Sequence, residues 1–99
     1  MNKISVCIAT YNGEKYIKEQ LKSIIPQLKK DDEIIISDDY SNDNTLKIIK
    51  SFRDPRIKIF TNPKKGLIFN FENAILNSSG DYIFLSDQDD IWHKNKVKI

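Results

Sequence analysis

The sequence predicts an α/β domain with a mainly parallel, doubly wound sheet. Apolar runs rich in β-branched residues alternate with segments whose apolar residues recur at helical spacing, and Asn-Gly, Asn-Pro and Ser-Gly dipeptides separate them. This alternation runs through the whole chain of 99 residues and is typical of successive right-handed βαβ units. Sheets of this kind bind ligands just past the carboxyl ends of their strands, so we expect functional residues directly after each strand.

The first half of the chain is expected to hold two strands and one helix. The run "KISVCIAT", residues 3–10, predicts the first strand, with Cys7 as a buried thiol, and it ends at the turn of "YNGE". From Glu14 onward the spacing predicts a helix that Pro26 should distort or end. Residues 34–36 form a short apolar strand of the kind that is buried on both faces of a parallel sheet. The buried stripe of the helix comprises Ile17, Leu21, Ile24, Ile25 and Leu28.

The second half is expected to repeat this order. The residues of "YSNDNT" can cap a helix that carries Leu46, Ile48, Ile49 and Phe52. A third strand over 57–61 and a helix over 67–77 follow, the helix ending at Gly80 as its C-terminal cap. A fourth strand covers "DYIFLS", residues 81–86, and the last eight residues, "WHKNKVKI", resemble the first turns of another helix. Within the 67–77 helix we expect Phe71, Ala74 and Ile75 to point inward.

Composition excludes several classes of protein. Hydrophobic residues make up 39% and charged residues 30%, as in ordinary globular domains. The net charge of +2 arises from 16 basic and 14 acidic residues, too small an asymmetry to indicate a nucleic-acid partner. No run approaches the roughly 20 apolar residues of a membrane span, and the N-terminus lacks a signal-peptide pattern. We therefore expect a cytoplasmic protein.

An acidic cluster follows the fourth predicted strand. In "LSDQDDIW", Asp87 and Asp89 flank Gln88 and can supply hard oxygen ligands to Mg²⁺ or Mn²⁺, which takes its further ligands from water and a diphosphate. Asp90 fits the N-cap of the next helix. Three aspartates exceed what capping requires, so the cluster predicts a metal site.

Polar residues also follow the other strands. Of Asp38 and Asp39, one can cap the next helix while the other accepts hydrogen bonds from a base N–H or a ribose hydroxyl. Tyr11 can stack on a base or pack against the first helix, and the residue taken alone favours packing. We expect all of these groups to converge on one edge of the sheet. The remaining polar residues at strand ends are Thr10, Asn12 and Asn62.

Three segments together resemble a known enzyme family. The segments "VCIATYNGEKYIKEQLKSI", "DEIIISDDYSNDNT" and "GDYIFLSDQDDIW", in this order, are similar to the nucleotide-binding half of family 2 glycosyltransferases, which are inverting sugar transferases. The resemblance covers essentially the whole chain and implies a Rossmann-like GT-A fold, truncated here, with strand order 3-2-1-4. The stretch "KKGLIFNFENAILNSSGDYIFLSDQDDIW" resembles the rhamnosyltransferase-type members in particular.

The resemblance implies a role for each matching position. Asp39 would recognise a pyrimidine base with Asp38 as its neighbour, Asp89 would hold a divalent metal on the diphosphate, and Asp87 would contact the ribose or the metal. Gly66 and Asn70 would lie near the sugar-diphosphate. The nucleoside pocket would be lined by Thr10, Tyr11 and Asn12.

The resemblance also implies partners and a division of labour. The donor would be a UDP- or dTDP-sugar and the acceptor a saccharide or a lipid-linked sugar, in cell-surface polysaccharide biosynthesis. The general base would lie in a later half of the domain, so we expect residues 1–99 to form the donor- and metal-binding part and to be inactive alone. Apolar surface that the later half would cover should be exposed and favour self-association. The full-length protein would work in the cytoplasm, at the inner face of the membrane.

Three other functions fit a doubly wound, acidic domain less well. A non-catalytic nucleotide-binding module would keep Asp39 and the metal motif without a base. A phosphoacceptor signalling domain and an aspartate-nucleophile phosphatase both need acidic residues after the first strand. Here that strand ends in Thr-Tyr-Asn, which disfavours both.

Overall fold

The computed structural model describes residues 2–87 and places a four-stranded, all-parallel sheet at the centre of the fold, in the order β3-β2-β1-β4. The predicted α/β class and strand order are confirmed. Asp89, Asp90 and the helix expected near the C-terminus lie outside the described residues. The elements are β1 (Ile4–Thr10), α1 (Ile17–Ile24), the 3-10 turn η1 (Ile25–Gln27), β2 (Glu33–Asp38), α2 (Thr45–Ser51), β3 (Ile57–Thr61), α3 (Leu67–Leu76) and β4 (Tyr82–Asp87).

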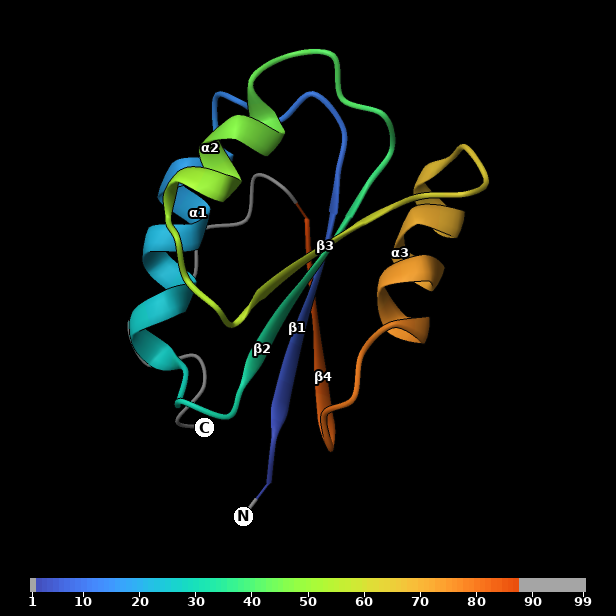
Figure 1. The fold of residues 1–99 in the computed structure, drawn as a ribbon. Coiled ribbons are helices and arrows are strands. Elements are labelled where there is room, and N and C mark those ends of the chain that lie inside the picture. The colour runs from blue at the N-terminus through green and yellow to red at the C-terminus, as the bar shows by residue number, and fades with distance from the viewer. Residues whose placement is uncertain (1, 88–99) are drawn as a thin grey trace.

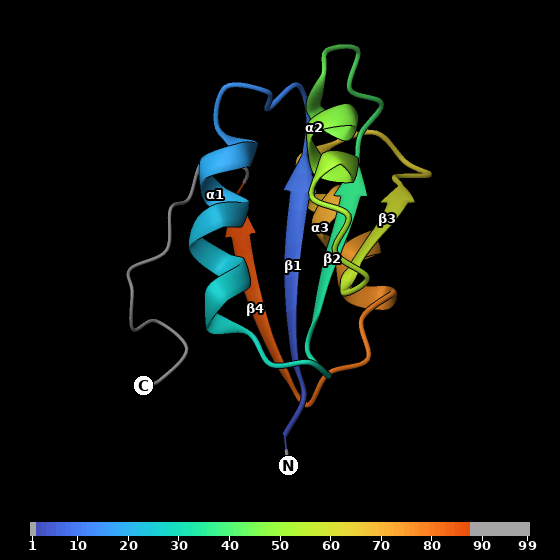
Figure 2. The same ribbon diagram turned by 60° about the vertical axis from the view of Figure 1, so that its left-hand side comes forward.

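Helices cover both faces of the sheet, as the doubly wound prediction requires. Figure 1 shows α1 and α2 on one face and α3 on the other. All four strands point the same way, and the connections that follow β1, β2 and β3 lie together at the carboxyl edge, at the top of Figure 2. The register aligns these ends, because Thr10 pairs with Asp38 and Asp38 pairs with Thr61, while Ala9 pairs with Asp87 on the other side.

The core is divided by the sheet into a large and a small part. Alternate residues of β1 and β2 pack against α1 and α2, and the residues between them face α3. On the α3 side Cys7 and Ile35 pack with Ala74, and burial raises the pKa of the Cys7 thiol to about 11. The thiol is therefore protonated and inert at neutral pH, as expected of a core cysteine. The larger part includes Val6, Ile8, Ile34 and Ile36 with Ile17, Leu21, Ile24 and Ile49.

The first helix behaves as its sequence predicts. The α-helix ends at Ile24, and Pro26 lies in the 3-10 turn η1 that follows. Proline has no backbone N–H and crowds the carbonyl four residues earlier, so the α-helical pattern stops there. Ile17, Leu21 and Ile24 are fully buried, which confirms the stripe within α1, while Ile25 is partly buried and Leu28 buried just beyond the helix.

Two predictions about α3 are wrong. Ile75 does not point inward: its side chain is 38% exposed, because the helix turns Asn70 and Ala74 toward the sheet. Gly80 is not a helix cap, because α3 ends at Leu76 and the cap position is Asn77. Gly80 instead lies against β1, where its N–H donates to Ser5 Oγ at 2.7 Å.

The described fold leaves apolar side chains exposed on β4 and α3. Ile83 and Leu85, at the margin of the described sheet, are 44% and 53% exposed. Leu67, Ile68 and Leu76 of α3 are more exposed still. Within residues 2–87, no helix is long and apolar enough to cross a membrane.

Candidate functional site

The residues that follow β1, β2 and β3 are bound to one another at the carboxyl edge. The Asp39 N–H donates to the Thr10 carbonyl at 2.9 Å, and the Asn62 N–H donates to the Asp38 carbonyl at 2.8 Å. The side chain of Asn70, from α3, also donates to the Thr10 carbonyl, at 3.1 Å. The structure therefore brings together the predicted residues after these three strands.

Asp38 accepts three short hydrogen bonds within the fold. One carboxylate oxygen accepts the hydroxyls of Thr10 and Ser41, both at 2.6 Å, and the other accepts the Ser41 N–H at 2.8 Å. Thr10 and Asp38 are both buried. These short bonds join β1 to the loop after β2, so the geometry gives Asp38 and Thr10 a structural role, and ligand contact by either remains a prediction.

Asp39 has a different environment. It is only 8% exposed, yet its carboxylate accepts two long hydrogen bonds, from Asn62 Nδ2 at 3.4 Å and from the Gly66 N–H at 3.2 Å. Among residues 2–87 the ion pairs involve Glu33 and Asp54, and none involves Asp39. An ionised carboxylate offers about four acceptor sites, and burying one without strong partners is costly. Asp39 therefore retains the capacity to accept a further hydrogen bond.

Asn12 joins the loops that follow β1 and β2. Its backbone has a φ of 49°, its N–H donates to Ser41 Oγ at 2.9 Å, and its Oδ1 accepts the Asn42 N–H at 2.9 Å. Tyr11 beside it is 49% exposed at the carboxyl edge, so the structure does not bury it against α1 as packing would require. Asn12 thus acts in this structure as a brace between loops, with Tyr11 at the surface next to it.

Asp43 strengthens the same pair of loops. Burial alone would raise its pKa, but hydrogen bonds from the Thr45 side chain, the Thr45 backbone and the Glu14 N–H outweigh burial and lower it. The Gly13 N–H donates to Thr45 Oγ1 at 2.8 Å, which completes the connection. The two loops are consequently joined by several hydrogen bonds.

The start of α3 completes this edge. Gly66, at its N-cap, has a φ of 125° and ψ of 152°, a conformation that is essentially reserved for glycine. Asn70, one turn further on, is 2% exposed, and its Oδ1 is buried with no hydrogen-bond partner in the part of the chain that the structure describes. Its amide is oriented by the Thr10 carbonyl, which requires the nitrogen on that side. Asn70 therefore presents an unsatisfied acceptor beside the end of β1.

The predicted metal ligands can be placed only in part. Asp87 ends β4 opposite Ala9, so its backbone reaches the carboxyl edge beside Thr10. Among residues 2–87, no group of three or more His, Cys, Asp or Glu side chains is arranged to hold a metal ion. Carboxylates are hard donors of the kind that Mg²⁺ and Mn²⁺ prefer, and a metal held by Asp87 and Asp89 stays a prediction.

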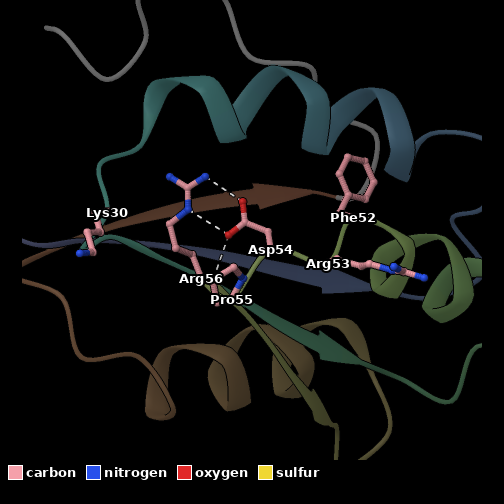
Figure 3. Close-up of a pocket in the computed structure, with 6 residues that line it drawn as sticks. All are labelled: Lys30, Phe52, Arg53, Asp54, Pro55 and Arg56. Carbon is pink, nitrogen blue, oxygen red and sulfur yellow. Dashed lines mark hydrogen bonds and ion pairs between the residues drawn. The ribbon is translucent and has the colours of Figure 1, made fainter.

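A hollow of about 390 Å³ lies at the opposite, amino edge of the sheet. Figure 3 shows Asp54 and Arg56 facing each other there, while Lys30 and Arg53 extend away on opposite sides. Arg56 donates to Asp54 at 2.7 and 3.0 Å and to the Leu28 carbonyl at 3.1 Å, and the first of these contacts holds the pKa of Asp54 below its usual range. Asp54 and Arg56, which face each other in this hollow, are paired with each other and with the backbone, so we assign this pair a structural role.

Sequence reasoning missed Ser41 and underrated Asn62. Ser41 lies three residues after Asp38, a spacing at which a capping aspartate accepts a backbone N–H, so the sequence contained a signal for this contact. Asn62 was expected at the edge but without a role, and its contacts with Asp39 and Gly66 depend on the β3–α3 loop folding back. Only the tertiary structure reveals them.

Comparisons with known proteins identify the family to which this sequence is similar. Residues 5–99 match the model of the family "Glycosyl transferase family 2". The chain is 48% identical to dTDP-rhamnosyl transferase RfbG of Shigella flexneri, with 92% of this chain and 34% of the relative aligned. It is 35% identical to UDP-Glc:alpha-D-GlcNAc-diphosphoundecaprenol beta-1,3-glucosyltransferase WfgD of Escherichia coli, covering 97% of this chain and 38% of that protein. The chain thus spans about a third of the length of these relatives.

Solved structures show the same fold. S. aureus TarS 1–349 in complex with UDP-GlcNAc superposes with a TM-score of 0.88 at 33% identity, over 97% of this chain and 29% of the 1–349 chain. The mannosyltransferase PcManGT from Pyrobaculum calidifontis, in complex with GDP-Man and Mn²⁺, shares the fold at 20% identity with a TM-score of 0.84, over 95% of this chain and 30% of that one. The four described strands are therefore the Rossmann-like part of a GT-A fold. The family match covers nearly the whole chain, and the chain belongs to glycosyl transferase family 2.

Proposed function

We propose that this chain is the donor- and metal-binding part of an inverting glycosyltransferase that transfers a sugar from a nucleotide-diphosphate sugar to an acceptor hydroxyl. The observation that carries the proposal is the state of Asp39, which is buried at the carboxyl edge, has no cation partner among residues 2–87 and accepts only two long hydrogen bonds. A pyrimidine N–H would complete its set of donors. A carboxylate in that position favours uracil and thymine, which carry a proton on N3, over cytosine, which does not.

The neighbouring residues would shape the nucleoside pocket. Tyr11 is exposed beside the end of β1 and would offer its ring to the base. Thr10, Asn12 and Asp38 would fix the loops that border the pocket, through the bonds described above. The unsatisfied Oδ1 of Asn70 would accept a hydroxyl of the ribose or of the donor sugar.

The diphosphate would be held through a divalent metal, Mn²⁺ or Mg²⁺, bound by Asp87 and Asp89. Such a metal neutralises the charge that grows on a diphosphate leaving group. Asp87 ends the strand next to β1, so a ligand that reaches it would also pass the end of β1. In this proposal the base and the diphosphate share one edge of the sheet.

We propose the classes of donor and acceptor from the relatives of this chain. The names of RfbG and WfgD describe transfer from dTDP-rhamnose and UDP-glucose, and that of WfgD describes a diphosphoundecaprenol-linked acceptor. We propose a UDP- or dTDP-sugar donor and a saccharide or lipid-linked acceptor, in the cytoplasm, for cell-surface polysaccharide biosynthesis. An inverting displacement also needs a general base against the acceptor hydroxyl, and we assign that role to none of the residues named here.

Nucleotide titration tests this proposal. We expect calorimetry to detect binding of UDP or dTDP that strengthens with Mn²⁺, that loses its metal dependence in Asp89→Ala, and that weakens about tenfold in Asp39→Asn, because a neutral amide oxygen accepts a weaker hydrogen bond than a carboxylate. Asn2→Asp, an exposed change at the amino edge, serves as a control for altered charge. Equal binding by wild type and Asp39→Asn would contradict the base-recognition role, and metal-independent binding would contradict the metal role.

We also infer that the chain self-associates through β4. This strand is at the margin of the described sheet, and Ile83 and Leu85 expose apolar surface on it, a combination that promotes edge-to-edge pairing. We expect sedimentation velocity to show oligomers at high concentration and the double substitution Ile83→Thr with Leu85→Thr to reduce them, since threonine keeps strand propensity. Ile68→Thr, at an exposed position of α3, should leave them unchanged. Oligomers that persist in the double variant would contradict this inference.

A further inference from the structure

Asn62 links three parts of the candidate site through one buried amide. It follows β3, is fully buried, and continues the β2–β3 hydrogen bonding through its N–H. Its Nδ2 lies 3.4 Å from both Asp39 Oδ1 and the Gly66 carbonyl, and its Oδ1 accepts the Lys64 N–H at 3.4 Å. The nitrogen faces two oxygens and the oxygen faces an N–H, so the orientation of the amide is determined by its neighbours.

A closed ring of contacts results. Asn62 donates to Asp39 and to the Gly66 carbonyl, and the Gly66 N–H donates to the other oxygen of Asp39. Both carboxylate oxygens are thereby fixed in direction, one by a side chain and one by the backbone. The glycine-specific conformation of Gly66 is what turns its N–H toward Asp39 and its carbonyl toward Asn62.

The hydrogen bonds to Asp39 in this ring are long, and their length indicates the role of the ring. N–H···O bonds in proteins cluster near about 2.9 Å, whereas those to Asp39 measure 3.2 and 3.4 Å. Asp38, one residue earlier, accepts bonds of 2.6 to 2.8 Å from its partners. The contacts to Asp39 are therefore suited to orienting the carboxylate, while the short contacts to Asp38 are suited to holding the loop.

The absence of charge on the donors to Asp39 also favours an orienting role. A lysine or arginine beside Asp39 would form a charge-assisted bond and use the acceptor capacity that a ligand needs. Asn62 and Gly66 are neutral donors, so they direct the carboxylate and leave its charge available. Lys64, two residues after Asn62, places its ammonium group 4.2 Å from the centre of the Phe69 ring, and the ion pairs among residues 2–87 leave Asp39 without a cation.

We propose that Asn62 is a positioning residue that turns the Asp39 carboxylate toward the N3–H of a bound uracil or thymine and so sets the selectivity for the base. The proposal rests on the proposed function, and it adds a residue that acts through Asp39 and has no contact with the nucleotide of its own. Loss of the Asn62 donor would leave the Asp39 carboxylate held by the Gly66 N–H alone, so one of its oxygens would no longer be directed. The penalty should therefore fall on recognition of the N3 proton and spare the rest of the nucleotide.

The discriminating measurement is a ratio of affinities. UDP and N3-methyl-UDP differ at the single group that Asp39 would read. We expect wild type to prefer UDP by at least tenfold, and Asn62→Asp and Asn62→Ala each to reduce that preference to threefold or less, while their affinity for N3-methyl-UDP changes less than twofold. Asn62→Asp keeps the shape and removes the donor, and Asn62→Ala removes the whole amide without adding a charge. Asn2→Asp is the matched control for charge and should retain the wild-type ratio.

The outcomes separate this inference from the proposed function. Equal loss of affinity for both nucleotides in both variants would mean that Asn62 only supports the fold, and would overturn the positioning role. A wild-type ratio retained in either variant would overturn it as well. If wild type shows no preference, or if Asp39→Asn retains the preference, the assignment of Asp39 to base recognition fails and the inference fails with it.

Discussion

Replacing Glu33 by glutamine is expected to lower the free energy of unfolding by about 3 kcal/mol at neutral pH. Glu33 is 2% exposed at the start of β2, where its carboxylate accepts the Ser5 hydroxyl at 2.6 Å and the Ser79 N–H at 2.7 Å and pairs with Lys58 at 3.0 Å. Burial alone would raise its pKa, but these hydrogen bonds and the charge of Lys3 outweigh burial and lower the pKa from 4.5 to about 2. Glutamine keeps the shape but loses the charge and turns an N–H₂ group toward donors. Urea denaturation at pH 7 measures the loss.

The pH dependence shows whether charge is the cause. Because the pKa of Glu33 is lower in the folded state, its contribution is fully present above about pH 4.5 and is lost as the pH falls toward 2. The difference between wild type and Glu33→Gln should therefore shrink as the pH falls from about 5 to 2. Glu72→Gln, at an exposed position of α3, should change stability by no more than about 0.5 kcal/mol at any pH. A difference between wild type and Glu33→Gln that stays constant with pH would show that packing is responsible.

Most of the fold could be predicted because local patterns and tertiary structure agree. The third strand was expected over 57–61 and is observed at Ile57–Thr61, where proline dipeptides mark both ends. The helical phase of α3 could not be predicted correctly, since a search for apolar periodicity selects Ile75 and passes over Asn70. The structure buries Asn70 because its amide reaches the Thr10 carbonyl, a contact between residues 60 positions apart.

The location of the candidate site could be predicted from the sequence, but the contacts of its residues could be predicted only in part. Topology rules place residues after parallel strands at one edge, which suffices to bring Thr10, Asp38, Asp39 and Asn62 together. The sequence did not distinguish the two aspartates by their contacts, because both follow the same strand. The difference arises from the loops: Ser41 adds two short hydrogen bonds to Asp38, while Asn62 and Gly66 give Asp39 only two long ones.

Gly80→Ala is expected to destabilise the fold by about 3 kcal/mol, because it forces a methyl group into the backbone of β1. A Cβ atom at this position would lie 2.5 Å from Ser5 Oγ, 2.7 Å from the Ser5 nitrogen and 3.0 Å from the Ile4 carbonyl carbon. The shift that relieves this overlap also breaks the bond from the Gly80 N–H to Ser5 Oγ and disturbs the hydroxyl that Ser5 donates to Glu33. The urea midpoint measures the effect.

A second substitution separates the possible causes of that loss. Ser5→Ala removes the nearest atom but leaves the Ser5 nitrogen and the Ile4 carbon in place, so combining it with Gly80→Ala should not restore stability. Leu76→Ala, at the exposed end of α3, is the control for a change in the same region and should cost no more than about 0.5 kcal/mol. Restoration by Ser5→Ala would show that a side chain limits the approach of the α3–β4 connection to β1. If Ser5→Ala does not restore stability, the close contact between the two backbones is what requires glycine. That contact would explain why Gly80 is a glycine although it does not cap α3.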